Sequence, residues 1–190
     1  MKVLFVTTGN PFSYYKGSIS PQVLGPAEAL IKNGINVDVF QITSRGIIGY
    51  IQSIPKIKKK LKHGEYDIIH AHYGYCGVIS AISKKKEKLI VSYMGSDLLG
   101  SINDKGNYTF SGWVFVFLNK VFSFISNHHS IVKSQEMSQK IWFNKNVSVI
   151  PNGVDFKLFS PIDKLKARKE LKLSIDRKII LFVGDSKSHG

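Results

Sequence analysis

The sequence contains a single cysteine and no run of apolar residues long enough to cross a bilayer. Cys76 cannot form an internal disulfide, so it is expected to be a buried structural thiol in a reducing compartment. The longest apolar segment, residues 113–125, is interrupted by Asn119, Lys120 and Ser123. The start, MKVLFVTT, is too short an apolar run for a secretion signal. These absences predict a cytoplasmic protein without a membrane span.

Acidic residues are scarce. The chain has 13 Asp and Glu against 27 Lys and Arg, which gives a formal net charge of +14. Such an excess favours polyanionic partners, among them phospholipid headgroups, pyrophosphates and nucleic acid. A general compositional bias towards lysine would give the same excess, and the sequence leaves that alternative open.

Several functional motifs are also missing. The first loop lacks Gly-x-Gly-x-x-Gly, which argues against a dinucleotide oxidoreductase. No nucleic-acid motif is present, and the aromatic residues gather in one apolar segment instead of alternating with lysines, so no nucleic-acid partner is expected. His70 and His72 share one face of a predicted strand, but no third ligand stands at a suitable spacing. We therefore predict no metal site.

Apolar runs alternate with segments of helical periodicity over the first 150 residues. Short β-branched and aromatic runs predict strands, and the longer segments between them predict helices. This order is typical of a doubly wound, mostly parallel, Rossmann-like α/β domain over residues 1–150, whose ligands bind beyond the carboxyl ends of the strands. The predicted strands are residues 2–8, 37–42, 67–72, 89–93, 130–133 and 147–150, and the helices are 23–31, 50–63, 74–86, 112–127 and 135–143.

The pattern changes after Pro151. Residues 151–177 are predicted to be a linker between domains, with one helix over residues 165–173. Residues 178–183 (KIILFV) have the composition of a buried strand, and we expect residues 178–190 to open a second domain that is truncated there.

Residues 149–161 read VIPNGVDFKLFSP. This stretch resembles the interdomain signature of the retaining, family 4-like (group 1) glycosyltransferases, which have the two-domain GT-B architecture. Three further stretches resemble the same family in the order it requires: YDIIHAHYGYCG, LIVSYMGSDLLG and IVKSQEM. The resemblance implies that the chain is the N-terminal, acceptor-side half of a GT-B fold.

The resemblance implies transfer of a sugar from a nucleotide-sugar donor to a saccharide or lipid-linked acceptor, in surface polysaccharide or glycolipid biosynthesis. It further implies retention of the anomeric configuration and no metal or other cofactor. Because donor contacts in this family lie mainly in the second domain, we expect this chain alone to bind acceptor weakly and to be inactive. A nucleotide-sugar epimerase of the same architecture, or a non-enzymatic basic module that binds polyanions, is the alternative.

Four residues are predicted to bind acceptor or substrate. Gly17 and Ser18 lie in the first loop, where backbone N–H groups at a helix start attract phosphate, although the family commonly has a Gly-Gly pair there. His72 ends a strand and should line the cleft, whereas His70 should be packed. Asp97 either accepts hydrogen bonds from sugar hydroxyls or caps nearby backbone.

Met94 stands where many members of the family have a histidine near the reacting sugar. Methionine can neither exchange a proton nor donate a hydrogen bond, so the catalytic residue is unknown. Asn152, Gly153 and Asp155 are expected to form the interdomain hinge, and Ser134 to cap a helix.

Two segments suggest a membrane surface. Five lysines crowd the end of the helix at residues 50–63, and the helix at residues 112–127 is rich in Trp and Phe. Together they could hold the domain on an anionic membrane, peripherally, on the cytoplasmic face. A solvated lysine face and a core helix are the alternatives. The residues concerned are Lys56, Lys58, Lys59, Lys60, Lys62, Trp113, Phe115, Phe117, Phe122 and Phe124.

Overall fold

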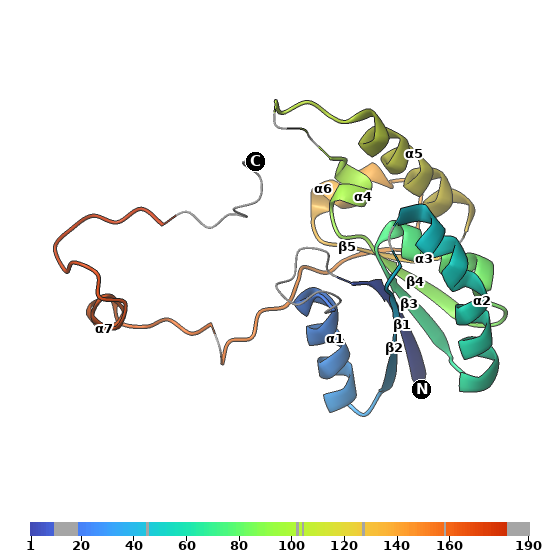
Figure 1. Ribbon diagram of the computed structural model, residues 1–190, viewed down its shortest axis with the longest axis horizontal. Helices are drawn as coiled ribbons and strands as arrows, with labels where there is room; N and C mark the ends of the chain where they lie inside the picture. Colours follow the sequence, from blue (N-terminus) through green and yellow to red (C-terminus); the bar gives the residue numbers. More distant parts are fainter. Residues whose placement is uncertain are drawn as a thin grey trace. The chain divides into compact units, whose positions relative to one another are not determined.

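The computed structural model describes residues 1–9, 19–44, 46–101, 103, 105–126, 128–157 and 159–181. The chain forms two compact units, Met1–Gly153 and Val154–Gly190. The first contains one parallel sheet in the order β2-β1-β3-β4-β5-β6 (Figure 1). Its strands are β1 (Lys2–Thr8), β2 (Asn36–Ile42), β3 (Ile68–His72), β4 (Lys88–Ser92), β5 (His129–Val132) and β6 (Val147–Val149).

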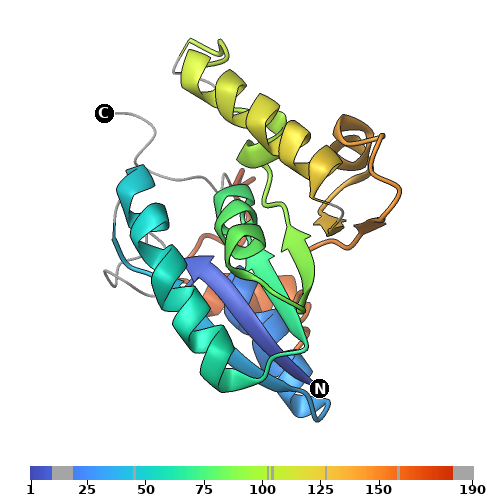
Figure 2. The same ribbon diagram turned by 90° about the vertical axis from the view of Figure 1, so that its right-hand side faces the viewer.

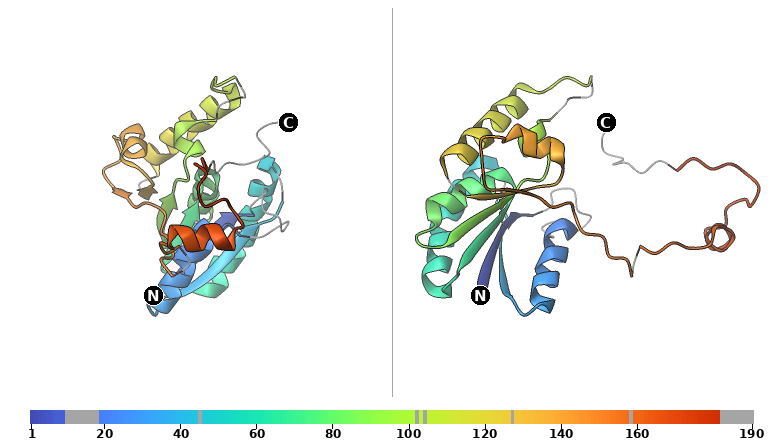
Figure 3. Two further views of the ribbon diagram at one scale, coloured as in Figure 1. Left: turned by 90° about the vertical axis from the view of Figure 1, so that its left-hand side faces the viewer. Right: turned by 180° about the vertical axis from the view of Figure 1, so that it is seen from behind.

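Helices cover both faces of this sheet. The helix α1 lies on one face, whereas α2 and α3 lie on the other (Figures 1 and 3). Along β1, Val3 and Phe5 pack with α1, while Leu4 and Val6 pack into the larger core with α2 and α3. The strand β1 is therefore apolar on both faces from Val3 to Val6. The helices of this unit are α1 (Pro21–Lys32), α2 (Gly46–Gly64), α3 (Gly74–Ser83), α4 (Ser96–Leu99), α5 (Phe110–Ile125) and α6 (Gln135–Lys140).

The predicted fold class is confirmed. All six strands lie within one or two residues of their predicted ranges, because each is an apolar run between polar turns. Two details differ. The helix α3 ends at Ser83, before the predicted residue 86, since Lys84 already has the extended backbone of the chain entering β4. The short helix α4 was not predicted, because four residues are too few to show helical periodicity.

The strand order reverses beside β1. The chain pairs β2 on one side of β1 and then crosses to pair β3 on the other. In open α/β sheets, ligands bind outside the carboxyl ends of the strands at such a switch point. The ends of β1 and β3, Thr8 and His72, are therefore where a site is expected (Figure 2).

The second unit contains the helix α7 (Lys164–Glu170), close to the predicted residues 165–173. The carboxylate of Asp163 caps it by accepting hydrogen bonds from the N–H groups of Leu165 and Lys166, both at 3.0 Å. Residues 178–181 form no strand, contrary to prediction, because no other strand lies among the described residues of this unit to pair with them. Residues 182–190 lie outside the described part, so the second domain stays a prediction.

Over the described residues, no helix is both long enough and apolar enough to cross a membrane. Cys76 is a free, fully buried thiol, as predicted, and its burial raises its pKa.

Candidate functional site

Two histidines lie at the end of β3. The rings of His70 and His72 stack with their centroids 4.3 Å apart, and both contact Phe5. The Nε2 of His70 is hydrogen-bonded to the hydroxyl of Ser92 at 2.8 Å. The side chain of His72 is 3% exposed, and neither of its ring nitrogens has a hydrogen-bond partner among the residues that the structure describes. His70 is thus a packed histidine, as predicted, whereas His72 retains its hydrogen-bonding capacity.

Burial keeps both imidazoles neutral. Loss of solvent, and after it the positive charge of Lys133, lowers the pKa of His70 to about 4. The pKa of His72 is held well below its usual value by burial first, and then by His70 and Lys133. At pH 7 each ring therefore offers one N–H donor and one acceptor nitrogen.

Asp97 is completely buried and binds backbone. Its carboxylate accepts hydrogen bonds from the N–H groups of Met94 at 3.0 Å, Gly95 at 2.9 Å and Gly74 at 3.2 Å. Burial raises the pKa of Asp97 above its usual value, and these hydrogen bonds offset only part of that rise. Of the two roles that the sequence left open, the observed contacts are those of backbone capping. They fix the loop after β4 against the start of α3.

The segment around Asp97 is held from a third element. The side-chain amide of Asn119, on α5, donates to the backbone carbonyls of Asp97 at 3.2 Å and Phe115 at 3.0 Å. Gly74 has to be glycine here, because a Cβ atom would collide with the Asn119 amide. The start of α3, the helix α4 and the middle of α5 therefore meet in a closely packed group at the carboxyl edge of the sheet.

Lys133, which sequence reasoning missed, follows β5 directly and is half-buried. Burial lowers the pKa of Lys133, and the charge of Asp97 acts in the opposite direction. The only signal in the sequence was a lysine directly after an apolar strand. In a chain with so many lysines, that signal alone did not distinguish it.

The remaining predicted residues are placed as follows. Ser134 caps α6, as predicted, by accepting a hydrogen bond from the N–H of Met137 at 3.3 Å. Gly17 and Ser18 lie outside the described residues. Met94 is half-buried, and its N–H is one of the donors to Asp97. No group of three or more His, Cys, Asp or Glu side chains in the described part could hold a metal ion.

The predicted hinge residues lie where the two compact units divide. Asn152 and Gly153 end the first unit, and Asp155 is the second residue of the next. The Asp155 carboxylate accepts a hydrogen bond from the N–H of Lys157 at 2.8 Å. All three residues are exposed. Their action as a hinge stays a prediction.

Residues 18–128, which include β3, α3, β4 and α4, match the family described as "Glycosyl transferase 4-like". The chain belongs to the glycosyl transferase 4-like family. The match covers more than half of the chain, and both His72 and Asp97 lie within it. Lys133 and the segment at residues 149–161 lie beyond it.

A curated relative agrees with this family. The chain is 25% identical over 138 residues to the UDP-Gal:alpha-D-GlcNAc-diphosphoundecaprenol alpha-1,3-galactosyltransferase of Escherichia coli. The alignment covers 72% of this chain and 36% of that enzyme. The chain therefore spans little more than a third of the relative's length.

Solved structures share the fold. Sucrose-phosphate synthase of Thermosynechococcus elongatus superposes with a TM-score of 0.64 at 17% identity, covering 92% of this chain and 53% of that one. A UDP-GlcNAc 2-epimerase of Methanocaldococcus jannaschii gives 0.52 at 12% identity, covering 80% and 46%. A glycosyltransferase of Rickettsia africae gives 0.52 at 13%, covering 92% and 50%. The same fold thus occurs in a synthase, an epimerase and a glycosyltransferase. The family match, and not the fold, places this chain among the glycosyl transferase 4-like proteins.

Proposed function

We propose that this chain is the acceptor-side domain of a glycosyltransferase that moves a sugar from a nucleotide-sugar donor to a saccharide or lipid-linked acceptor, in surface polysaccharide or glycolipid biosynthesis. The observation that carries the proposal is the glycosyl transferase 4-like match over residues 18–128, which contains the end of β3 at the switch point. The E. coli relative, whose name specifies a UDP-sugar donor and a diphosphoundecaprenol-linked acceptor, supports this substrate class.

The residues at the sheet edge suit acceptor binding. His72 can donate or accept one hydrogen bond at each ring nitrogen, and no protein group uses either within the described part of the chain. Asp97 does not reach substrate from its buried position but positions the backbone of Met94 and Gly95. We propose that Gly17 and Ser18 complete the acceptor side and that residues 152–155 allow the two domains to close.

The finer mechanism follows the family resemblance. We propose that the full-length enzyme retains the anomeric configuration, uses no cofactor beyond its nucleotide-sugar co-substrate, and requires no metal ion. We also propose that it is cytoplasmic. The chain of 190 residues should not transfer sugar by itself, because the donor contacts are expected in a second domain.

A transfer assay tests this proposal. The full-length protein, supplied with radiolabelled UDP-galactose and an N-acetylglucosamine linked to a lipid diphosphate, should form a lipid-linked disaccharide and release UDP. The 190-residue chain should form none. An enzyme that instead interconverts the UDP-sugar without any acceptor would be an epimerase, and the proposal would be wrong. Transfer by the 190-residue chain alone would contradict the division of labour between the domains.

The outer face of α5 supports a membrane-bound acceptor. Its inner face is buried against the domain at Gly112, Phe115, Asn119, Phe122 and Ser123. The residues of its outer face recur at helical spacing and are apolar. Phe124 on this face contacts Phe143, which follows α6. The neighbouring Trp142 is also exposed. Exposed aromatic residues on one helix face are typical of interfacial membrane binding. The outer residues are Phe110, Trp113, Phe117, Val121, Phe124 and Ile125.

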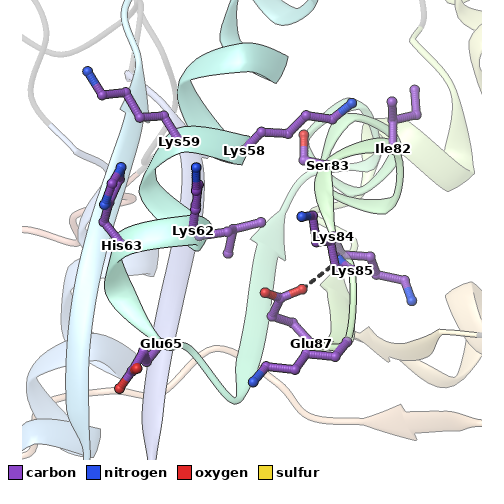
Figure 4. Close-up of a pocket in the computed structure, with 12 residues that line it drawn as sticks. Lys58, Lys59, Lys62, His63, Glu65, Ile82, Ser83, Lys84, Lys85 and Glu87 are labelled. Atoms are coloured by element: carbon purple, nitrogen blue, oxygen red, sulfur yellow. Dashed lines mark hydrogen bonds between the residues drawn. The ribbon is translucent and has the colours of Figure 1, made fainter.

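Lysines gather where α2 and α3 end. The ends of α2 and α3 enclose a hollow of about 870 Å³ (Figure 4). The helix α2 contacts α3, and α3 contacts α5, which crosses beyond the carboxyl ends of the strands (Figure 2). We propose that the side of the domain formed by these three helices faces an anionic membrane peripherally, with α5 inserted and the lysines against headgroups. The lysines of the hollow are Lys58, Lys59, Lys62, Lys84, Lys85 and Lys86.

Replacing both Trp113 and Phe124 by serine should reduce binding to anionic vesicles at least tenfold, because each exposed aromatic side chain contributes about 1.5–3 kcal/mol when buried in an apolar phase. Co-sedimentation with vesicles containing phosphatidylglycerol measures this effect. Ile31→Ser, at an exposed apolar site on α1 across the sheet, is the control and should bind normally. Equal binding to neutral and anionic vesicles, or unchanged binding by the double variant, would contradict the proposed membrane surface.

A further inference from the structure

Lys133 lies on the same face of the sheet as His72, at the carboxyl ends of the strands. The strand register pairs His72 with Ser92, and Ser92 with Ile131. Side chains alternate along a strand, so Lys133, two residues beyond Ile131, shares the face of all three. Two strand spacings of about 4.8 Å separate β3 from β5, a gap that a lysine side chain can bridge. The charge of Lys133 also acts on both His70 and His72.

Among the described residues, no carboxylate forms a salt bridge with the ammonium group of Lys133. The salt bridge in the described part of the chain joins Lys2 and Asp38, at 3.5 Å, and does not involve Lys133. The carboxylate whose charge acts on Lys133 is that of Asp97, and its oxygens are already taken by backbone N–H groups. A half-buried cation without a partner is unfavourable, and an anionic ligand would relieve this cost.

His72 provides the second, independent observation. Its ring is buried, and both nitrogens lack partners among the described residues. Most buried polar groups in proteins are hydrogen-bonded, and an unsatisfied one commonly marks a site for a ligand, water or ion. A neutral imidazole beside an ammonium group offers one N–H donor and one positive charge. A phosphoryl oxygen accepts from both.

We propose that Lys133 and His72 together hold a phosphoryl group of the acceptor at the carboxyl ends of β5 and β3. The inference rests on the proposed function and specifies its substrate class: the acceptor is linked to its lipid through phosphate or diphosphate. The nucleotide-sugar donor also contains a diphosphate, so the chemistry alone does not separate the two sources. The experiment therefore compares them.

The test is an NMR titration of the 190-residue chain in which the amide signals report binding. Geranyl diphosphate is added in one arm and UDP in the other. Lys133→Gln should weaken geranyl diphosphate binding about tenfold, the loss expected for one charge-assisted hydrogen bond. Lys133→Arg should keep affinity within about threefold, because it keeps the charge. His72→Gln should also weaken binding. Lys140→Gln, an exposed lysine on α6, is the matched control and should bind normally.

Three results would overturn the inference. They are unchanged geranyl diphosphate binding by Lys133→Gln, no binding by the unaltered chain, and a loss confined to UDP, which would assign the site to the donor. Unchanged amide spectra in the absence of ligand show that each variant is folded. If the full-length enzyme transferred no sugar while Lys133→Gln still weakened diphosphate binding, the proposed function would fail and the phosphoryl site would stand. If the Lys133→Gln enzyme still transferred sugar and its KM for the acceptor were unaltered, the proposed function would stand and the phosphoryl site would fail.

Discussion

Replacing Asp97 by alanine should lower the free energy of unfolding by about 3–5 kcal/mol, among the largest effects expected of a single substitution here. The change leaves the N–H groups of Met94, Gly95 and Gly74 buried or half-buried without their acceptor. Urea denaturation at pH 7 measures the loss. Asp97→Asn keeps one acceptor oxygen and should lose less than half as much.

Asp155 is the control for this prediction. It is exposed and accepts a single backbone hydrogen bond, from Lys157, so Asp155→Ala should cost less than about 1 kcal/mol. If Asp97→Ala were as mild as Asp155→Ala, the carboxylate would not be organising the loop after β4. Its position would then have to be explained by a ligand.

Acidification from pH 7 to pH 4.5 should destabilise the domain by several kcal/mol. Burial lowers the pKa of His70 and His128 to about 4 and that of His72 well below its usual value. In the unfolded chain these histidines bind protons below about pH 6.5. Their contribution is therefore complete above that pH and is lost as the pH falls, at about 2–3 kcal/mol for each histidine by pH 4.5.

One group opposes this trend. The pKa of Asp97 is raised in the folded chain, so Asp97 gains its proton more readily there, and acid offsets part of the loss. Urea denaturation over this pH range measures the net slope. His128→Phe should reduce the slope of stability against pH by about one proton. His128 is stacked on Phe122, so another aromatic ring keeps this packing and removes only the titration and the hydrogen bonds of the imidazole. Stability independent of pH would contradict the buried, neutral histidines.

The sheet could be predicted from the sequence because its strands are short runs rich in apolar and β-branched residues. β1, for example, is buried from Val3 to Thr7, and such a continuous run is a strong local signal. The family followed from short motifs at strand ends, which are also local. The helix α4 gave no such signal, because its few residues are held by the packing of Asp97 and Asn119.

The candidate site was only partly predictable. His72 could be found because it ends a strand, but its lack of a hydrogen-bond partner among the described residues depends on which side chains surround it. The capping by Asp97 involves Gly74, 23 residues away, and no local pattern connects them. Lys133 was missed because its proximity to His72 follows from the register of β3, β4 and β5, which only the assembled sheet defines. Gly17 and Ser18 remain predictions.

The account depends on acceptor binding at the carboxyl edge of this sheet. Mapping the amide shifts of the 190-residue chain with a lipid diphosphate-linked N-acetylglucosamine tests it most directly. The shifts should gather at Gly9, Tyr73, Gly95 and Ser134, which follow the ends of β1, β3, β4 and β5. Shifts confined to the opposite edge, at Lys62, Gly64, Lys85 and Glu87, would contradict the assigned site and the acceptor-side role with it.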